Sequence, residues 1–472
     1  MRNKIINSIN KNSDKSYVVD RGKIVAYYKT LKSDLLHLNA FFEYHEIKKI
    51  LIKLPQGFQA YSLIIAAYLS NVCFCVIDEF SCRLREEHFL SQYKPDIVFG
   101  VNNNSLNCDC QYIKYEKAIE FFDPPRCVEL CDEFWYDASQ ELAYVLFTSG
   151  TTGMPKGCCI KRKSIETFIE KASNIFNLES NDVYGQYAPL FFDMSMLDVF
   201  LCTSIGATLV PFSTKVDKLR PGSVIQQNRI TFINAVPQMI EILKRGKQLS
   251  TAYLSSLRAI KLGGDKVRKD IVKDLFECTN IRELFVTYGP TEATVFCMIN
   301  KLSKDDWFTM EDSIVPLGSN IEGYSGIDII NDEIVVKGIC VAQGYLDGTP
   351  GGFCELEGVS AYRTGDYAVK KEGRLLFSGR EDSQYKINGV RIDLSEVELA
   401  FSKYCVAAHA LCINENIVVF VISTNAVDYL QRIIAAELPQ VLQPRVIIKV
   451  DDLPKLSNGK IDNKKLLDIY GA

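Results

Sequence analysis

Residues 149–157 have the sequence Ser149-Gly150-Thr151-Thr152-Gly153-Met154-Pro155-Lys156-Gly157 and directly follow the apolar run Ala143–Phe147. An apolar run that opens into a glycine-rich segment predicts a strand followed by a loop that holds phosphate. Glycines let the backbone approach an anion closely, and successive amide groups can form a concave anion site. The hydroxyl groups and the ammonium of Lys156 add donors and positive charge. Because the spacing does not fit a Walker A loop, we expect a phosphate-binding loop of another kind.

Length and composition predict a folded protein of several units. The chain has 472 residues, which is too long for one ordinary core. Its net charge of −4 offers no basic surface for nucleic acid. The polar residues 1–15 lack the apolar core of a signal peptide, and the run Phe58–Ile77 is interrupted by Ser70-Asn71. That run therefore predicts a buried helix and a strand rather than a membrane span, and we expect a cytoplasmic protein.

Sixteen cysteines raise the question of disulfides or a metal. Most of them stand inside apolar runs, where free thiols behave as small hydrophobic groups; these are Cys73, Cys75, Cys158, Cys159, Cys202, Cys297 and Cys412. The one cluster, Cys108, Cys110, Cys127 and Cys131, does not have the usual spacing of a zinc site, and the chain contains no C-x-x-C pair. We expect buried free thiols and no metal, and whether the cluster binds anything stays open.

The alternation of apolar runs with helical patterns from about Leu51 to Asn300 predicts an α/β fold. The expected strands are Ile50–Leu54, Cys73–Ile77, Asp96–Val101, Tyr144–Phe147, Ala207–Pro211, Thr231–Ala235 and Ala259–Leu262. A strand-rich stretch follows, with strands at Gly326–Ile330, Glu333–Val336 and Arg374–Phe377.

The pattern restarts after Gly379-Arg380-Glu381-Asp382. Asp393-Leu394-Ser395-Glu396 has the spacing of a capping box and predicts a helix through about Tyr404. Strands at His409–Ile413 and Ile417–Ser423 and a helix near Val427–Glu437 are expected next. This segment is long enough for a small α+β domain, so we predict domains at residues 1–381 and 382–472.

Further strings come in a fixed order along the chain. They are Phe192-Asp193-Met194-Ser195, Tyr288-Gly289-Pro290-Thr291-Glu292, Tyr362-Arg363-Thr364-Gly365-Asp366, Gly379-Arg380-Glu381-Asp382, Gln384-Tyr385-Lys386-Ile387-Asn388-Gly389-Val390-Arg391 and Leu453-Pro454-Lys455-Leu456-Ser457-Asn458-Gly459-Lys460. Together with residues 149–157 they resemble the adenylate-forming superfamily, and within it the amino-acid-activating adenylation domains of nonribosomal peptide synthetases and the D-alanine–carrier-protein ligases, here free-standing. The resemblance covers roughly Leu51 to Asp462.

The resemblance implies a large N-terminal adenylation domain of α/β layers with a strand-rich subdomain. It also implies a small mobile α+β C-terminal domain that rotates about a hinge at Asp382. The implied reaction is a ligase reaction in which ATP and an amino acid form aminoacyl-AMP and pyrophosphate. The aminoacyl group then passes to the phosphopantetheine thiol of a separate carrier protein.

The resemblance implies ATP and Mg²⁺ as cofactors and assigns the nucleotide to a set of residues from both domains. These are Thr148, Ser149, Gly150, Thr151, Thr152, Gly153, Lys156, Gly264, Thr287, Tyr288, Gly289, Pro290, Thr291, Asp366, Arg380 and Lys460. The catalytic residues would be Lys460, Lys156 and Glu292, with Glu292 helping to hold Mg²⁺. Thr291 would donate to the α-phosphate, Tyr288 would offer a face to adenine, and Asp366 would hold the ribose hydroxyls.

The resemblance also implies an acyl pocket in which Asp193 binds the substrate's α-ammonium. Its other walls would be Met194, Leu197, Asn234, Lys261, Gly263, Thr287, Val295 and Phe296. The set is similar to that of D-alanine ligases at Asp193, Thr287 and Val295, and it departs from theirs at Gly263 and Phe296. We expect Lys261 to point to solvent, the alternative being a pairing with an acidic side chain. The amino acid and its stereochemistry stay open.

In the C-terminal region, Gly389 would lie beside the tunnel for the thiol arm, while Lys386 and Arg391 are either functional or ordinary strand charges. The chain stops shortly after Lys460, so we expect the acceptor thiol to come from another protein or from coenzyme A. The lysines near this end form either a face for an acidic carrier protein or an ordinary solvated surface.

Two alternative functions remain at this point. An acyl- or aryl-CoA ligase would share the nucleotide motifs, and Asp193 is the residue that separates it from an amino-acid-activating enzyme. A non-catalytic adenylation-like binding protein is expected to lack Lys460, Asp366 or Glu292, and all three are present.

Overall fold

The computed structural model describes residues 1–101, 110–121, 129–132, 135–148, 154–309, 311–380, 384–387, 390–414, 416–455 and 461–471. These residues divide into two compact units. The first comprises residues 1–79, 89–147 and 157–379, and the second comprises residues 80–88, 148–156 and 380–472. Asp382 falls outside the described residues, so the domain boundary and the hinge stay predictions.

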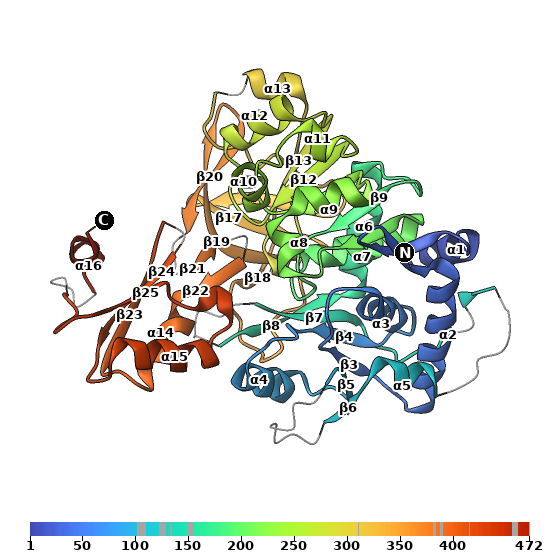
Figure 1. Ribbon diagram of the computed structural model, residues 1–472, viewed down its shortest axis with the longest axis horizontal. Coiled ribbons are helices and arrows are strands. Elements are labelled where there is room, and N and C mark those ends of the chain that lie inside the picture. Colours follow the sequence, from blue (N-terminus) through green and yellow to red (C-terminus); the bar gives the residue numbers. More distant parts are fainter. Residues whose placement is uncertain are drawn as a thin grey trace. The chain divides into compact units, whose positions relative to one another are not determined.

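A nine-stranded sheet is the largest element of the first unit (Figure 1). Its order is β15 (Ser319–Asn320), β14 (Met298–Leu302), β13 (Glu283–Tyr288), β12 (Ala259–Gly263), β11 (Phe232–Ala235), β9 (Val183–Gln186), β10 (Thr208–Pro211), β1 (Ser16–Asp20) and β2 (Lys23–Tyr27). The central strands from β13 to β1 pair in parallel, and β14, β15 and β2 pair antiparallel at the edges. Parallel strands align their carboxyl ends at one edge, where ligands bind in open α/β sheets.

A second, six-stranded sheet in this unit precedes the phosphate-loop sequence. Its order is β6 (Gln111–Ile113), β5 (Ile97–Phe99), β3 (Lys49–Ile52), β4 (Cys73–Val76), β7 (Leu142–Thr148) and β8 (Lys156–Lys161). The strand-rich stretch forms a third sheet from β16 (Gly326–Ile330), β17 (Glu333–Lys337), β18 (Phe353–Leu356), β19 (Val359–Lys371) and β20 (Arg374–Arg380). The predicted α/β fold is therefore confirmed, and each expected strand is present to within a few residues.

Helices connect the strands of the two larger sheets (Figure 1). They are α1 (Arg2–Lys11), α2 (Tyr28–Tyr44), α3 (Phe58–Leu69), α4 (Arg83–Tyr93), α5 (Tyr115–Ile119), α6 (Arg162–Phe176), α7 (Met194–Ile205), α8 (Lys215–Leu219), α9 (Pro221–Asn228), α10 (Gln238–Arg245), α11 (Thr251–Leu254), α12 (Lys269–Cys278), the short 3₁₀ turn η2 (Thr291–Ala293) and α13 (Lys304–Thr309). The run from Phe58 to Ile77 forms α3 and then β4, as predicted. No described helix is long and apolar enough to cross a membrane.

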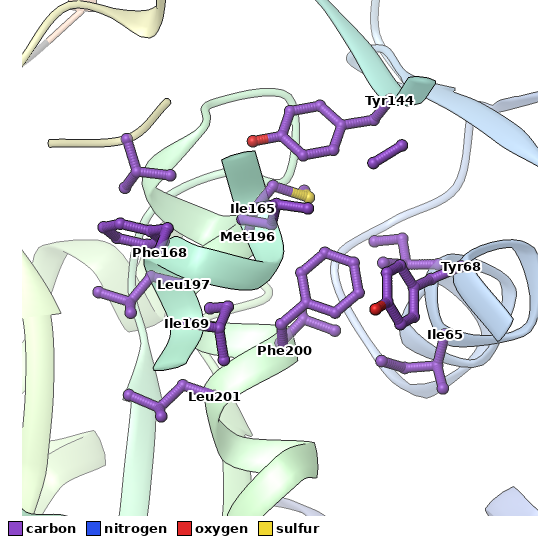
Figure 2. Close-up of a cluster of buried hydrophobic side chains, with 14 of the residues drawn as sticks. Ile65, Tyr68, Tyr144, Ile165, Phe168, Ile169, Met196, Leu197, Phe200 and Leu201 are labelled. Atoms are coloured by element: carbon purple, nitrogen blue, oxygen red, sulfur yellow. The ribbon is translucent and has the colours of Figure 1, made fainter. Parts of the chain in front are cut away.

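Helix α7 is central to the core, because it is apolar on all sides and nearly every residue of it is buried. Figure 2 shows Leu197 and Phe200 of α7 among Phe168 of α6 and Tyr68 of α3. The ring centroids of Tyr68 and Phe200 lie 5.2 Å apart. Close packing of this kind holds a helix in one place, so side chains at its N-terminus are held on a rigid support.

The second unit contains the predicted α+β elements. They are the hairpin β21 (Gln384–Ile387) and β22 (Val390–Asp393), helix α14 (Leu394–Ser402), the sheet of β23 (Ala407–Ile413), β24 (Asn416–Ile422) and β25 (Val446–Lys449), and helices α15 (Val427–Glu437), η3 (Gln440–Leu442) and α16 (Asn463–Tyr470). Asp393 caps α14 by accepting a hydrogen bond from the Ser395 amide at 2.9 Å, one residue before the amide that the predicted capping box would use.

Candidate active site

Asp193 stands at the N-cap of α7 and is only partly exposed. Burial raises the pKa of its carboxyl to about 6, because removal from water disfavours the charged form. A hydrogen bond to Thr291 and the positive charge of Lys261 oppose this shift, and the charge of Glu292 adds to it. The structure thus brings together Asp193, the Thr291–Glu292 motif and Lys261.

Asp198, five residues further along α7 than Asp193, forms a second polar cluster with Tyr184 and Asn234. It is fully buried and accepts hydrogen bonds from the Tyr184 hydroxyl at 2.9 Å and from Asn234 Nδ2 at 2.7 Å. Burial raises the pKa of Asp198 to about 7. Among the described residues, Asp198 Oδ2 and Asn234 Oδ1 are buried and have no hydrogen-bond partner.

The expectation that Lys261 points to solvent is wrong. Lys261 lies on β12 beside Asn234 of β11, and only 1% of it is exposed. Burial lowers the pKa of its ammonium to about 8, while the charges of Asp198 and Asp193 oppose that shift. Its Nζ lies 5.5 Å from the centroid of the Phe296 ring. Asp198 and Asp193 are the acidic groups that act on it. Among the described residues it forms no ion pair, so the alternative expectation of a pairing with an acidic side chain is not confirmed either.

Gly263 and Gly289 allow the segments at the ends of β12 and β13 to pack closely against their neighbours. A Cβ on Gly263 would lie 2.4 Å from Thr287 Oγ1 and 3.0 Å from Lys261 Nζ. A Cβ on Gly289 would lie 2.5 Å from Phe296 Cα, so the loop after β13 can reach β14 only with glycine there. Val295, just before Phe296, has a φ of 71°, which is strained for a β-branched residue. The adjacent strands place Asn234 beside Lys261 and Gly263 beside Thr287, and their roles in an acyl pocket stay predictions.

Two tyrosines hold the carboxylates predicted to serve the nucleotide. The Tyr288 hydroxyl, at the end of β13, donates to Asp366 Oδ2 of β19 at 2.7 Å. The Tyr345 hydroxyl donates to Glu292 Oε1 at 2.7 Å and lies 3.2 Å from the Tyr362 hydroxyl. Asp366 and Glu292 are fully buried.

Residues 132–346 match the AMP-binding enzyme family. The chain therefore contains an AMP-binding domain. A D-alanine–D-alanyl carrier protein ligase of Bacillus licheniformis is 28% identical over 376 residues, which covers 73% of this chain and 72% of the relative. A ligase of the same name from Staphylococcus haemolyticus is 28% identical and covers 82% of each chain.

Among solved structures, this chain is similar to a Vibrio cholerae adenylation domain, AlmE, in complex with glycyl-adenosine-5'-phosphate. The TM-score is 0.84 at 21% identity, and the match covers 100% of this chain and 98% of the other. At this level of identity the likeness shows the fold.

The other predicted site residues have separate outcomes. Met194 and Leu197 of α7 and Val295 are buried, with Leu197 inside the main apolar core. Thr148, Lys156 and Arg380 fall in the second unit, and their roles stay predictions. Ser149, Gly150, Thr151, Thr152, Gly153, Asp382, Gly389 and Lys460 lie outside the described residues.

The sequence reading missed Asp198, Tyr345 and Tyr362. Asp198 carried a signal, since it is a lone carboxylate in an otherwise apolar helix and such a group needs buried partners. Tyr345 and Tyr362 carried none, because Tyr345 donates to Glu292, which is 53 residues away in sequence, and Tyr362 contacts the Tyr345 hydroxyl.

Most predicted buried thiols are free and buried, and Cys412 is half-buried. Cys110 and Cys131 are free and half-buried, whereas Cys108 and Cys127 lie outside the described residues. Within the part of the chain that the structure describes, no group of three or more His, Cys, Asp or Glu side chains could hold a metal ion. Whether the four cysteines bind anything therefore stays open.

Proposed function

We propose that this chain activates an amino acid as aminoacyl-AMP with ATP and transfers it to the phosphopantetheine thiol of a separate carrier protein. The observation that carries the proposal is the place of Asp193 beside Thr291 and Glu292, at the carboxyl ends of the parallel strands. A partly buried carboxylate gains from a cationic partner, and the α-ammonium of an amino acid supplies one. The carrier protein ligases among the relatives support the same reading.

In the first step a carboxylate oxygen of the amino acid attacks the α-phosphorus of ATP. The bond from that phosphorus to the bridging oxygen breaks, and pyrophosphate leaves with the electron pair. Two anions meet, so the site needs fixed cations where charge gathers. Lys156 and Lys460 would supply them, and Asp366 and Tyr288 would hold the nucleoside.

Glu292 would help to hold Mg²⁺. Its carboxylate fits a hard cation that prefers oxygen ligands, and Tyr345 fixes the orientation of one of its oxygens. Bound Mg²⁺ would neutralise phosphate charge. Buried beside Asp193, the Glu292 carboxylate also adds negative charge that a cation there would relieve.

In the second step the thiol sulfur attacks the carbonyl carbon of aminoacyl-AMP and the thiol proton passes to solvent. The bond from that carbon to the phosphate oxygen breaks, so a thioester forms and AMP leaves with the electron pair. We propose that the C-terminal domain rotates about Asp382 between the two steps, withdrawing Lys460 and bringing Gly389 beside the thiol arm. A few hinge residues can absorb such a rotation, and it can limit turnover.

The test is ATP–pyrophosphate exchange over a panel of proteinogenic and common nonproteinogenic amino acids in both stereochemical forms, with fatty and aryl acids beside them. We expect exchange with at least one amino acid and none with the other acids. Exchange with fatty or aryl acids alone would make the chain an acyl- or aryl-CoA ligase. Exchange with no acid, in the presence of ATP binding, would make it a binding protein.

A substitution of one residue tests the same proposal. Lys460→Ala should lower exchange by about 100-fold or more, because it removes the cation placed where charge develops. ATP binding should change little. The matched control is Lys464→Ala, an exposed lysine on α16, which should exchange like the parent protein. Undiminished exchange in Lys460→Ala would contradict the assignment.

A further inference from the structure

Helix α4 contacts the chain on either side of the predicted phosphate loop, residues 149–157. The centroid of the Phe89 ring lies 4.5 Å from that of Phe147, near the end of β7 where the loop begins. His88 Nε2 lies 2.8 Å from the carbonyl oxygen of Pro155, close to where the loop ends. The same helix therefore contacts both ends of the loop.

The helix that carries His88 is firmly packed. Phe89, Leu90 and Tyr93 are buried in an apolar cluster with strands β3, β4 and β5. The Tyr93 hydroxyl also donates to the Cys73 carbonyl at 2.9 Å. Close packing of this kind limits the movement of an element, so a side chain on it is held more precisely than one on a loop.

The hydrogen bond from His88 acts on the peptide unit that leads into Lys156. A carbonyl oxygen only accepts, so His88 Nε2 carries the proton and donates it to Pro155. Because a peptide unit is planar, the direction of the Pro155 carbonyl also sets the direction in which the backbone continues into Lys156. Pro155 is buried, and a buried carbonyl that loses its partner is costly. His88 therefore restrains the backbone just before Lys156.

A second restraint lies just after Lys156. The Gly157 carbonyl accepts a hydrogen bond from the Leu346 amide at 2.7 Å. The Lys156 carbonyl itself lies 3.5 Å from Thr148 Oγ1, which is at the limit of a hydrogen bond. The backbone of Lys156 is thus held on both sides, and His88 supplies the restraint on the side of the loop.

We propose that His88 is a positioning residue of the phosphate loop: it holds the Pro155 carbonyl and so keeps the Lys156 ammonium where the phosphate chain of ATP binds. His88 acts through Lys156 and not by contact with the nucleotide. A cation that is already in place binds an anion more strongly, because binding then requires no ordering of the loop. This inference rests on the proposed function, since it takes residues 149–157 as the loop that holds phosphate.

Two substitutions separate the donor from the bulk of the side chain. His88→Met keeps the length and removes the donor, so the Kd for ATP with Mg²⁺, measured by calorimetry, should rise by about 10-fold. His88→Gln restores an N–H group at a similar reach, so its Kd should lie within about threefold of the wild-type value. An unchanged Kd in folded His88→Met, or equal losses in both variants, would overturn the inference.

A double-mutant cycle tests the route through Lys156. Lys156→Met alone should raise the Kd for ATP by about 10-fold or more, because it removes the cation. In that background His88→Met should raise the Kd by less than about twofold further, since residues that act as a unit are not additive. A second full loss of about 10-fold would show that His88 does not act through Lys156.

The matched control is His37→Met. His37 is also a half-buried histidine, and its Nδ1 lies 2.8 Å from the Ser33 carbonyl oxygen within α2. This variant should keep the wild-type Kd for ATP even where its unfolding temperature falls. A rise in Kd equal to that of His88→Met would attribute the effect to a general loss of stability and contradict the inference.

Pyrophosphate exchange gives a further readout and separates this inference from the proposed function. In His88→Met the KM for ATP should rise while the KM for the amino acid stays unchanged, a split that lower stability alone does not produce. A rise of both KM values by the same factor would count against the inference. A wild-type protein that binds ATP in the expected His88-dependent way, but exchanges pyrophosphate with no amino acid, would overturn the proposed function and leave the role of His88 standing.

Discussion

The buried carboxylates in the two halves of the candidate site differ in their hydrogen bonding. On the nucleotide side, Asp366 and Glu292 each accept a hydrogen bond from a tyrosine hydroxyl. On the acyl side, Asp198 and Asn234 each keep a buried oxygen without a partner among the described residues, and Lys261 has no ion pair. Unpaired buried polar atoms are rare in stable cores and are found where a ligand or function requires them. If these roles are right, we expect the nucleotide side to be preorganised and the acyl side to be completed by its substrate.

The strongest test of the acyl side is Asp193→Asn. The amide keeps the shape of the side chain but loses the charge proposed to hold the α-ammonium. Removing one member of a desolvated charge pair costs about 3 kcal/mol or more, so kcat/KM for the amino acid should fall by about 100-fold or more. ATP binding, measured by calorimetry, should stay as in the wild type. A loss of ATP affinity of the same size would mean that Asp193 belongs to the nucleotide half.

Tyr345→Phe tests the nucleotide side next. It removes the donor to Glu292, and a hydrogen bond to a charged group is worth about 1.5 to 3 kcal/mol. We expect exchange to fall by about 10-fold and the Mg²⁺ concentration for half-maximal rate to rise. The control is Tyr324→Phe, which removes a buried hydroxyl that donates to the Thr294 carbonyl at 2.7 Å. Equal Mg²⁺ dependence in both variants would show that only stability had changed.

A smaller effect is expected from Tyr288→Phe. The ring that would face adenine remains, and only the hydrogen bond to Asp366 is lost. A loss of about 1 kcal/mol corresponds to about a fivefold rise in the KM for ATP. The KM for the amino acid should not move, which a steady-state titration of each substrate would show. If the amino acid KM rose instead, the division of the site into two halves would be wrong.

The smallest effect lies in the second unit and serves as a reference outside the site. His409 pairs with Glu398 at 2.8 Å and contacts Asn463. Burial lowers the pKa of His409, but the hydrogen bonds to these two side chains and the charge of Glu398 raise it above its ordinary value of 6.5. A raised pKa adds stability that is fully present below pH 6.5 and is lost as the pH rises through the folded-state value. His409→Gln should therefore lower the unfolding temperature more at pH 5.5 than at pH 8.5, by a few degrees at most. Exchange at neutral pH should not change, and an equal destabilisation at both pH values would disprove the linkage.

Local pattern was enough where the neighbours in sequence are also the neighbours in space. The strand Gly326–Ile330 and the helix Val427–Glu437 have the predicted bounds, because period-2 and period-3.6 apolar patterns and flanking turn residues specify them. The same holds for the helix opened by Asp393, although its capping bond goes to the Ser395 amide. The motif strings were enough to predict the AMP-binding domain, and they contain Asp193, Thr291 and Glu292, which the structure brings together.

The sequence pattern did not predict the environment of a side chain where that environment depends on segments far away in the sequence. Lys261 was expected to point to solvent because a lysine is unusual in the wall of a mostly apolar pocket. Its burial follows from its place between β11 and β13 and from the missing side chain at Gly263, and neither is visible from Lys261 alone. The tyrosines that hold Glu292 and Asp366 likewise come from strands and loops far along the chain.

The amino-acid sequence by itself determined the α/β class, the order of the elements and the resemblance to the adenylate-forming superfamily. Periodicity, turn residues and motifs are local features of the chain, so they can be recognised without the tertiary structure. Only the tertiary structure decided that Lys261 faces Asp193 and Asp198, and that tyrosines orient Glu292 and Asp366. The physical reason is that electrostatic and hydrogen-bond energies depend on distance in space and on exclusion of water, and both arise only when the strands pack side by side.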